Sequence, residues 1–380
     1  MTANDSARVT SVVGGELVLP GGVVRGVLEL QGDAIVSVDA RSGPAAAGRI
    51  FDASGLIVAP GYIDAQINGA YGIDITTEPG RIVDVGEHLT RHGVTAFVPT
   101  IITCPPELRE AAMRAARGPA EGAVPVGLHL EGPMLNPARR GAHPQRWLVA
   151  PSPGVIAGWT RSAGVVMVTL APELPGAIDV IRTLTQAGVV VSIGHTDCSA
   201  EQFAAGRAAG ARYVTHLFNA MRPFGHRDPG PIGAALGDDS VVAGLICDGI
   251  HVDPVAVRMA WRALGPQRLN LVTDAVAALG GDGARIGSVD VAVSGGEVRA
   301  ADGVLAGSVL SLDQALRNLV VFTGCAVPDA VATVTSTPAD VLRSTDRGRL
   351  VVGGRADITV LDPDLRVVAT VVGGVVAWRS

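Results

Sequence analysis

Short apolar runs alternate with helical patterns through the middle of the chain, and this rhythm constrains the fold more than any other feature. Candidate strands span residues 56–64, 94–99, 124–130, 165–171, 189–194, 212–216, 241–247 and 269–273. Helical patterns lie between most of them, at 81–92, 106–117, 175–187, 199–209 and 254–264. Eight strands in a strand–helix repeat of roughly 220 residues favour a (β/α)8 barrel, an α/β fold, over an open sheet.

The two ends of the chain have a different pattern. Residues 1–56 and 346–380 hold short apolar segments punctuated by glycine turns, without a helical period. We therefore predict a small, discontinuous β-sandwich domain built from both termini, with the barrel at 57–345. We expect glycine-rich turns and short strands at residues 280–306, and helical patterns follow at about 309–324 and 328–343.

Charge and composition limit the classes of partner. A formal net charge of −6 argues against nucleic acid or an anionic membrane as the main ligand. No apolar run reaches the ~18–20 residues that span a bilayer, and residues 1–6 lack the pattern of a secretion signal. We therefore expect a cytoplasmic protein. Its scattered cysteines should be buried thiols rather than a disulfide framework: Cys104, Cys198, Cys247 and Cys325.

Polar side chains close several of the predicted strands. Glu131, His195 and His216 each follow an apolar run, and the carboxyl ends of barrel strands carry the chemistry in this fold. A single such histidine is more often structural, but two imidazoles and a carboxylate together leave a position open, as in a catalytic metal site. We predict one divalent metal ion per subunit, zinc first, with iron, cobalt, manganese or cadmium as alternatives.

Two further residues could carry out proton chemistry beside this metal. Asp274 follows the eighth apolar run, where an ionised carboxylate is costly unless it is paired or functional. We interpret it as the general base and acid, the alternative being an ion pair or a turn cap. His143 lies in the loop after Glu131 and could polarise a substrate carbonyl, the alternative being a surface histidine.

The first strand ends on amides rather than imidazoles. Many metal-dependent barrel hydrolases carry His-x-His here, whereas this chain has Gln66 and Asn68 at the same spacing. Neutral amides bind transition metals weakly compared with imidazole. We therefore predict one tightly held metal, with Gln66 giving at most a weak second-metal or water contact.

The loops after the sixth and seventh strands hold groups suited to a phosphate. Asn219 and Arg227 follow the sixth strand, and His251 follows the seventh. An amide, a guanidinium fork and an imidazole can together bind a phosphate group. The alternative for Arg227 is a solvated loop charge. We interpret His88, His92 and His129 as structural.

Several segments, in the same order along the chain, resemble those of the N-acetylglucosamine-6-phosphate deacetylases of the amidohydrolase superfamily. The most specific are HLEGP at 129–133 and THLFNAM at 215–221. Weaker matches stand at 60–69, 141–143, 194–196, 247–253, 272–275 and 305–308.

This resemblance implies deacetylation of N-acetylglucosamine 6-phosphate to glucosamine 6-phosphate and acetate, in amino-sugar recycling. It implies metal ligation by Glu131, His195 and His216, with Asp274 and His143 catalytic. The sugar phosphate would be bound by Ala142, Asn219, Ala220, Arg227, His251, Ala306, Gly307 and Ser308. Similar enzymes are homodimers, so Arg227 and His251 could act across the interface.

Two alternatives stay open at this point. The chain could be another amidohydrolase, such as an N-acyl amino acid deacylase or a cyclic amidase. It could also be a catalytically retired barrel with an interaction role, although the intact set of Glu131, His195, His216 and Asp274 argues against that.

Overall fold

A nearly closed parallel barrel forms the larger part of the computed structural model, which describes residues 8–39, 48–116, 122–283 and 285–380. Asp274 N–H donates to Gln66 O at 2.9 Å and Asn68 N–H donates to Ala275 O at 2.8 Å, so the last strand contacts the first. The predicted (β/α)8 fold is therefore confirmed. The barrel strands are β6 (Tyr62–Ile67), β9 (Val94–Ile101), β11 (Leu128–Glu131), β12 (Val165–Leu170), β13 (Val190–Ile193), β14 (Tyr213–Val214), β15 (Val242–Leu245) and β16 (Leu269–Leu271).

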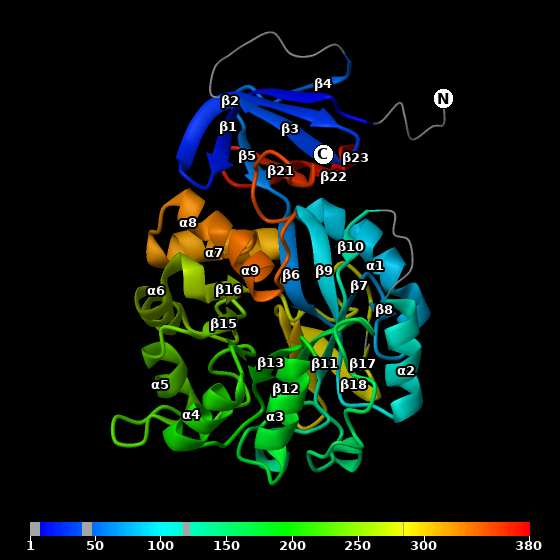
Figure 1. The fold of residues 1–380 in the computed structure, drawn as a ribbon, viewed down its shortest axis with the longest axis vertical. Coiled ribbons are helices and arrows are strands. Elements are labelled where there is room, and N and C mark those ends of the chain that lie inside the picture. Colours follow the sequence, from blue (N-terminus) through cyan, green and yellow to red (C-terminus); the bar gives the residue numbers. More distant parts are fainter. Residues whose placement is uncertain (1–7, 40–47, 117–121, 284) are drawn as a thin grey trace.

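Helices pack around the barrel in the expected order (Figure 1). They are α1 (Ile82–Leu89), α2 (Pro106–Ala115), α3 (Ala177–Gln186), α4 (Ala200–Ala209), α5 (Gly230–Gly237), α6 (Pro254–Arg268), α7 (Leu312–Thr323), α8 (Val327–Ala332) and α9 (Ser336–Val341). Residue 117, at the end of the second predicted helix, lies outside the described residues. Among the described helices, none has both the length and the apolar character needed to cross a membrane.

Two helical predictions differ from the structure. The sequence did not predict α5, because its glycines and proline have low helix propensity. The single helix expected at 328–343 is instead two helices, because Thr335 has φ −130° and ψ −84°, outside the helical region. The chain turns there, and α9 packs against β6 and β16.

The strand predicted at 56–64 is also two strands. β5 (Ile57–Pro60) pairs with β1 and β21 of the terminal sheet, and β6 begins the barrel after Gly61. A Cβ at Gly61 would lie 2.2 Å from Thr95 Oγ1, so β6 and β9 approach too closely there for a side chain. The boundary between the domains at residue 56 stays a prediction.

Both ends of the chain build one mixed sheet, seen at the top of Figure 1 with the two termini. Its strands are β1 (Ser11–Leu19), β2 (Gly22–Gln31), β3 (Ala34–Asp39), β4 (Ile50–Asp52), β5, β21 (Ile358–Leu361), β22 (Val367–Val372) and β23 (Val375–Arg379). Leu28, Ile35, Ile358 and Val371 are fully buried in one shared core. Strands from the N-terminal and C-terminal segments therefore share one sheet and one core, as predicted. Residues 1–7 and 40–47 of the predicted domain lie outside the described residues.

A third, antiparallel sheet covers the carboxyl end of the barrel. It contains β17 (Arg285–Ile286), β18 (Val289–Ser294), β19 (Glu297–Ala300) and β20 (Leu305–Ser308). Ile286, Val298 and Ala306 pack on Ile102 and Val276 of the barrel. The short strands predicted within 280–306 are present, although residue 284 lies outside the described residues. The remaining short strands are β7 (Gly69–Ala70), β8 (Ile73–Asp74) and β10 (Val124–Pro125).

A polar layer lies inside the barrel around His129 of β11, two residues before Glu131. His129 is fully buried, with Nε2 2.7 Å from Thr169 Oγ1 and Nδ1 3.2 Å from Thr100 Oγ1. Burial lowers the pKa of His129 to about 4, so the ring is neutral near pH 7. These contacts agree with the structural role expected for His129.

Candidate active site

Glu131, His195 and His216 converge at the carboxyl end of the barrel. Glu131 Oε1 lies 3.1 Å from His195 Nε2 and 3.0 Å from His216 Nε2, and the two Nε2 atoms are 3.1 Å apart. All three side chains are buried. Three ligand atoms this close can hold one divalent ion, and the set matches the donors that zinc and related metals prefer. The predicted ligands therefore fit a single metal.

The tautomer of His195 suits metal binding. Its Nδ1 lies 2.9 Å from the backbone O of Arg139, which can only accept a hydrogen bond. Nδ1 therefore carries the proton and Nε2 offers its lone pair toward Glu131 and His216. Burial, and then the neighbouring His143, lower the pKa of His195 to about 4, so the ring is neutral near pH 7.

Glu131 is an anion in this surrounding. Burial alone would raise its pKa, but the neighbouring imidazoles of His143, His195 and His216 hold that pKa well below the usual value for a carboxylate. Burial disfavours the charged form of His216, but the adjacent Glu131 raises the pKa of that ring. The Glu131 carboxylate supplies one negative charge to the site. This charge partly compensates a divalent cation.

His143 presents a proton to the same space. The N–H of Thr103 donates to His143 Nδ1 at 3.2 Å, so the neutral ring carries its proton on Nε2. That Nε2 lies 3.7 Å from Glu131 Oε2, beside the three ligand atoms. His143 is therefore buried and oriented as a donor, rather than on the surface.

Asp274 is held in place by the amides at the end of β6. Asn68 Nδ2 donates to its Oδ1 at 2.7 Å and Gln66 Nε2 donates to the same atom at 3.0 Å. Burial, and then the charge of Glu131, raise the pKa of Asp274 to about 6. A carboxyl group with a pKa near 6 can both accept and return a proton near neutral pH.

Gln66 stands between the two carboxylates. Its Nε2 donates to Glu131 Oε1 at 3.3 Å as well as to Asp274. The side-chain oxygens of Gln66 and Asn68 are buried and have no hydrogen-bond partner in the described part of the chain. An amide that directs N–H groups at both carboxylates disfavours a second cation between them.

Three of these residues have an unusual backbone. His195, His216 and Asp274 adopt φ values of 48°, 28° and 49°, in the left-handed region that residues other than glycine rarely occupy. Each follows the end of a barrel strand, where the chain turns and directs the side chain inward. Such strain, about 1–3 kcal/mol per residue, is concentrated at functional sites.

A cavity of about 330 Å³ opens over these residues. Most of the predicted site residues line it: Glu131, Ala142, His143, His195, His216, Asn219, Ala220, His251, Asp274, Ala306 and Gly307. Ser308 is buried just outside the lining, where its Oγ donates to Thr273 O at 2.6 Å. The structure therefore brings together side chains from distant parts of the sequence.

His251 belongs to the cavity of its own chain. Its Nδ1 donates to Asp248 Oδ2 at 2.6 Å, and Asp248 Oδ1 accepts from the N–H groups of Ile250 and His251. The seventh strand end therefore supplies His251 without a second copy of the chain.

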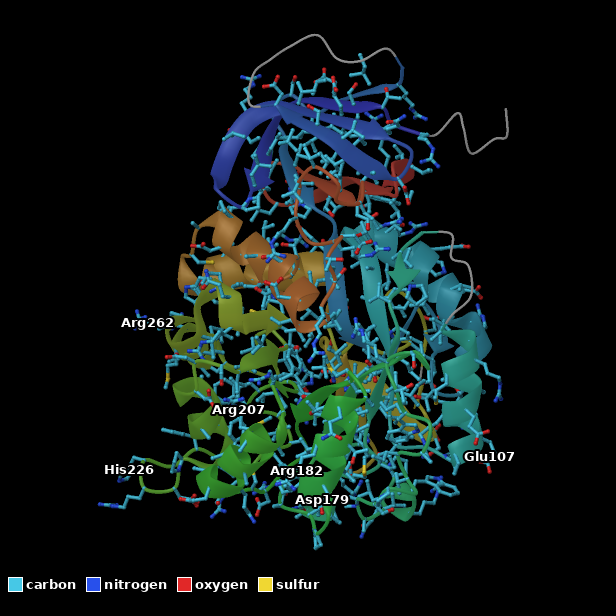
Figure 2. All side chains as sticks on the ribbon, viewed as in Figure 1. Glu107, Asp179, Arg182, Arg207, His226 and Arg262 are labelled. Carbon is cyan, nitrogen blue, oxygen red and sulfur yellow. The ribbon has the colours of Figure 1, made fainter. Side chains whose placement is uncertain are left out.

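Arg227 is the predicted residue that the structure places apart from the cavity. It is exposed in the loop between Met221 and α5, beside His226, which projects away from the body of the protein (Figure 2). Arg227 is absent from the lining of the cavity. Within one chain it therefore does not contact the other candidate residues.

Sequence reasoning missed several residues of the lining. Arg299 of β19 lines the cavity, where its guanidinium pairs with Glu297 at 2.7 Å and donates to Gly303 O at 2.6 Å. Ile102, Ile246 and Ile286 form its apolar side. No spacing pattern marked them, because Ile286 and Arg299 come from the antiparallel insertion, while Ile102 and Ile246 are apolar residues directly after β9 and β15.

Comparisons with known proteins agree with this geometry. The model of the Amidohydrolase family matches residues 57–377. N-acetylglucosamine-6-phosphate deacetylase from Rattus norvegicus is 40% identical over 349 residues, covering 87% of this chain and 85% of the relative. The Bacillus subtilis (strain 168) enzyme of that name is 36% identical over 337 residues, covering 85% of each chain.

Solved structures give the same result. A mutant of N-acetyl-D-glucosamine-6-phosphate deacetylase from Mycobacterium smegmatis, in complex with N-acetyl-D-glucosamine-6-phosphate, has a TM-score of 0.89 and 34% identity. It covers 98% of this chain and 99% of its own. The Thermotoga maritima structure has a TM-score of 0.89 and 31% identity, covering 97% and 100%. The chain belongs to the amidohydrolase family and, within it, to the N-acetylglucosamine-6-phosphate deacetylases.

Proposed function

We propose that this protein hydrolyses the acetamide of N-acetylglucosamine 6-phosphate to glucosamine 6-phosphate and acetate, in amino-sugar catabolism. The observation that carries the proposal is the grouping of Glu131, His195 and His216 with Asp274 and His143 around one cavity. The relatives that bear this name, one of them solved with that sugar phosphate, support the choice of substrate.

Glu131, His195 and His216 would hold one divalent ion, with zinc the first candidate. Such an ion supplies Lewis-acid activation of water and of the amide carbonyl. Arg139 O would keep the His195 ring in its ligating tautomer through the 2.9 Å hydrogen bond. Gln66 would orient Glu131 and Asp274 rather than bind a second ion.

The chain's own residues then move the protons. Asp274 takes a proton from the attacking water with the carboxylate oxygen that Gln66 and Asn68 leave free. His143 keeps its proton and donates a hydrogen bond from Nε2 to the carbonyl oxygen as negative charge develops on that oxygen. Asp274 then returns the proton to the amine nitrogen as the C–N bond breaks.

The sugar phosphate would lie along the remaining lining. Asn219 and the residues around Ala142, Ala220, Ala306 and Gly307 would bind the sugar. Ser308 would support that segment from below. His251 would contact the sugar phosphate from the same chain, and Arg227 would reach it from a second copy, as a homodimer would allow.

One experiment separates this function from the other amidohydrolase reactions. The purified protein is assayed for acetate release from N-acetylglucosamine 6-phosphate, N-acetylglucosamine and N-acetyl amino acids, before and after treatment with a chelator. We expect release from the phosphorylated sugar far above the others, loss with the chelator and recovery with added Zn²⁺. Faster release from an N-acetyl amino acid would contradict the proposed substrate.

A further inference from the structure

A second cavity, of about 510 Å³, lies at the opposite end of the barrel from the candidate active site. Ile63, Ala96 and Val166 line it from near the beginnings of β6, β9 and β12. Residues 342–347, which follow α9 and lead to the terminal sheet, line its other side. The mechanism proposed above uses none of these residues.

Arg161 presents an unsatisfied donor at this cavity. Its Nη2 donates to Leu342 O at 2.5 Å. Its Nη1 is buried and has no hydrogen-bond partner in the described ranges of the chain. A buried guanidinium N–H without a partner carries an uncompensated desolvation cost, so a native structure needs a reason to keep it.

Arg343 adds a second positive charge to the lining. Among the residues that the structure describes, its side chain has no ion pair and no hydrogen bond. Its φ of 55° lies in the left-handed region, where an arginine is strained. Burial, and then the charge of Arg343, lower the pKa of Arg161, so each of the two positive charges disfavours the other.

Two other charged groups stand among the described residues of the lining. Arg347 pairs with the buried Asp357. Asp346 Oδ1 accepts from Ser344 Oγ at 2.9 Å. Asp346 is the one carboxylate among the described residues of the lining, and it makes no ion pair with Arg161 or Arg343, which remain as two positive groups.

We propose that this cavity binds a small molecule carrying a phosphate monoester. Two guanidinium groups match the charge of a dianion, and their planar forks match the geometry of a phosphate better than that of an apolar ligand. A phosphate would accept from the buried Nη1 of Arg161 and separate the two like charges. The site is distinct from the catalytic cavity and does not depend on the proposed reaction.

Inorganic phosphate is the probe for the test. Its effect on Tm is measured by titration on the whole protein, with sulfate and acetate as the dianionic and monoanionic comparisons. We expect phosphate and sulfate to raise Tm and acetate to do so much less. In Arg161→Gln and Arg343→Gln, the Kd for phosphate should rise roughly tenfold or more, since each substitution removes a charge-assisted hydrogen bond.

A matched control keeps the result interpretable. Arg182→Gln removes an arginine from the outer face of α3, where the side chain is 58% exposed, and should leave the phosphate titration unchanged (Figure 2). The variants at 161 and 343 should keep the deacetylation rate within twofold. If phosphate does not raise the Tm of the parent protein, the proposal is wrong. It is also wrong if phosphate raises the Tm of the variant that carries both Arg161→Gln and Arg343→Gln by as much as it raises the Tm of the parent. In the second case phosphate binds elsewhere, as at the catalytic cavity.

Discussion

At the scale of single residues, the hydrogen bonds to Asp274 determine how it can act. Asn68 and Gln66 both donate to Oδ1, so this oxygen is occupied and the second carboxylate oxygen faces the cavity. The chain therefore keeps one oxygen of the carboxylate for position and one for proton transfer. The two nitrogens of His195 also have separate roles: Nδ1 donates to Arg139 O and positions the ring, and Nε2 faces Glu131.

The first prediction concerns this carboxylate. Asp274→Asn can still accept both hydrogen bonds through its carbonyl oxygen, but its amide cannot accept a proton. We expect kcat to fall by roughly 10²–10⁴-fold while the metal content and the binding of substrate persist. Steady-state kinetics and metal analysis of the purified variant check this. Near-normal kcat would contradict the role of Asp274 as general base.

The second prediction concerns Asp64, which is fully buried and accepts from Thr273 Oγ1 at 2.6 Å. Burial raises its pKa to about 7, above the usual 3.8. Between pH 4 and 7 the folded state therefore holds a proton that the unfolded state has lost. The wild-type protein should lose stability as the pH rises through this window, by roughly 4 kcal/mol at most, relative to Asp64→Asn.

Urea unfolding of the two proteins at pH 5 and pH 8 measures this difference. The free energy of unfolding of Asp64→Asn minus that of the wild type should be larger at pH 8. The exposed substitution Asp179→Asn is the control and should show no such change (Figure 2). An equal difference at both pH values would mean that Asp64 titrates normally.

At the scale of elements, the strand ends place the ligands, and Gly194 shows how closely they are packed. It lies between β13 and His195. A Cβ at this position would lie 2.8 Å from Thr169 Cγ2 and 2.8 Å from Thr215 Cβ. β12, β13 and the end of β14 therefore meet at a point that has no space for a methyl group.

The third prediction follows from this contact. Gly194→Ala must displace the turn that carries His195, so we expect metal affinity to fall by roughly 10–100-fold, as when the support of a ligand is lost. Competition with a chelating dye measures the affinity. Gly80→Ala is the control, because a Cβ there meets no atom within 4 Å. Unchanged affinity in Gly194→Ala would show that the strand ends can adjust.

The fourth prediction concerns the loop that carries Arg227. If this exposed loop completes the site of a second copy, Arg227→Ala should raise KM for the phosphorylated sugar by roughly tenfold or more, with little change in kcat. Arg262→Ala, on the outer face of the molecule, is the control (Figure 2). An equal effect on N-acetylglucosamine without phosphate would contradict a phosphate contact.

The sequence was sufficient to predict those strands, helices and site residues that follow a local pattern. Glu131, His195 and His216 were found because each closes an apolar run, and their common location follows from the barrel. Gly61 could not be recognised as the break between β5 and β6, because only its contact with Thr95 shows that a side chain is excluded. Arg299 was missed because the insertion that carries it has no period tied to the barrel. The helix α5 was missed because tertiary packing overrides its low propensity.

At the scale of the whole molecule, the terminal sheet depends on both ends of the chain. β21 pairs with β5, so the last strands complete the sheet that the first strands begin. The fifth prediction is that deleting residues 350–380 exposes this core and abolishes cooperative folding. Deleting only 375–380, the edge strand β23, should lower Tm but keep the barrel and its activity. Circular dichroism melts of both truncations check this. A soluble, active protein lacking 350–380 would show that the barrel folds alone.

The pairing of β5 with β21 also has a consequence for biosynthesis. β5 ends at Pro60 and β21 begins at Ile358, so about 300 residues must be translated between the two partners. At about 5–20 residues per second, the early strands wait roughly 15–60 seconds for their neighbour. During that time the unpaired edge of β5 is open to association with other nascent chains. A ribosome-bound chaperone that shields residues 8–60 would therefore act on this protein before its barrel is complete.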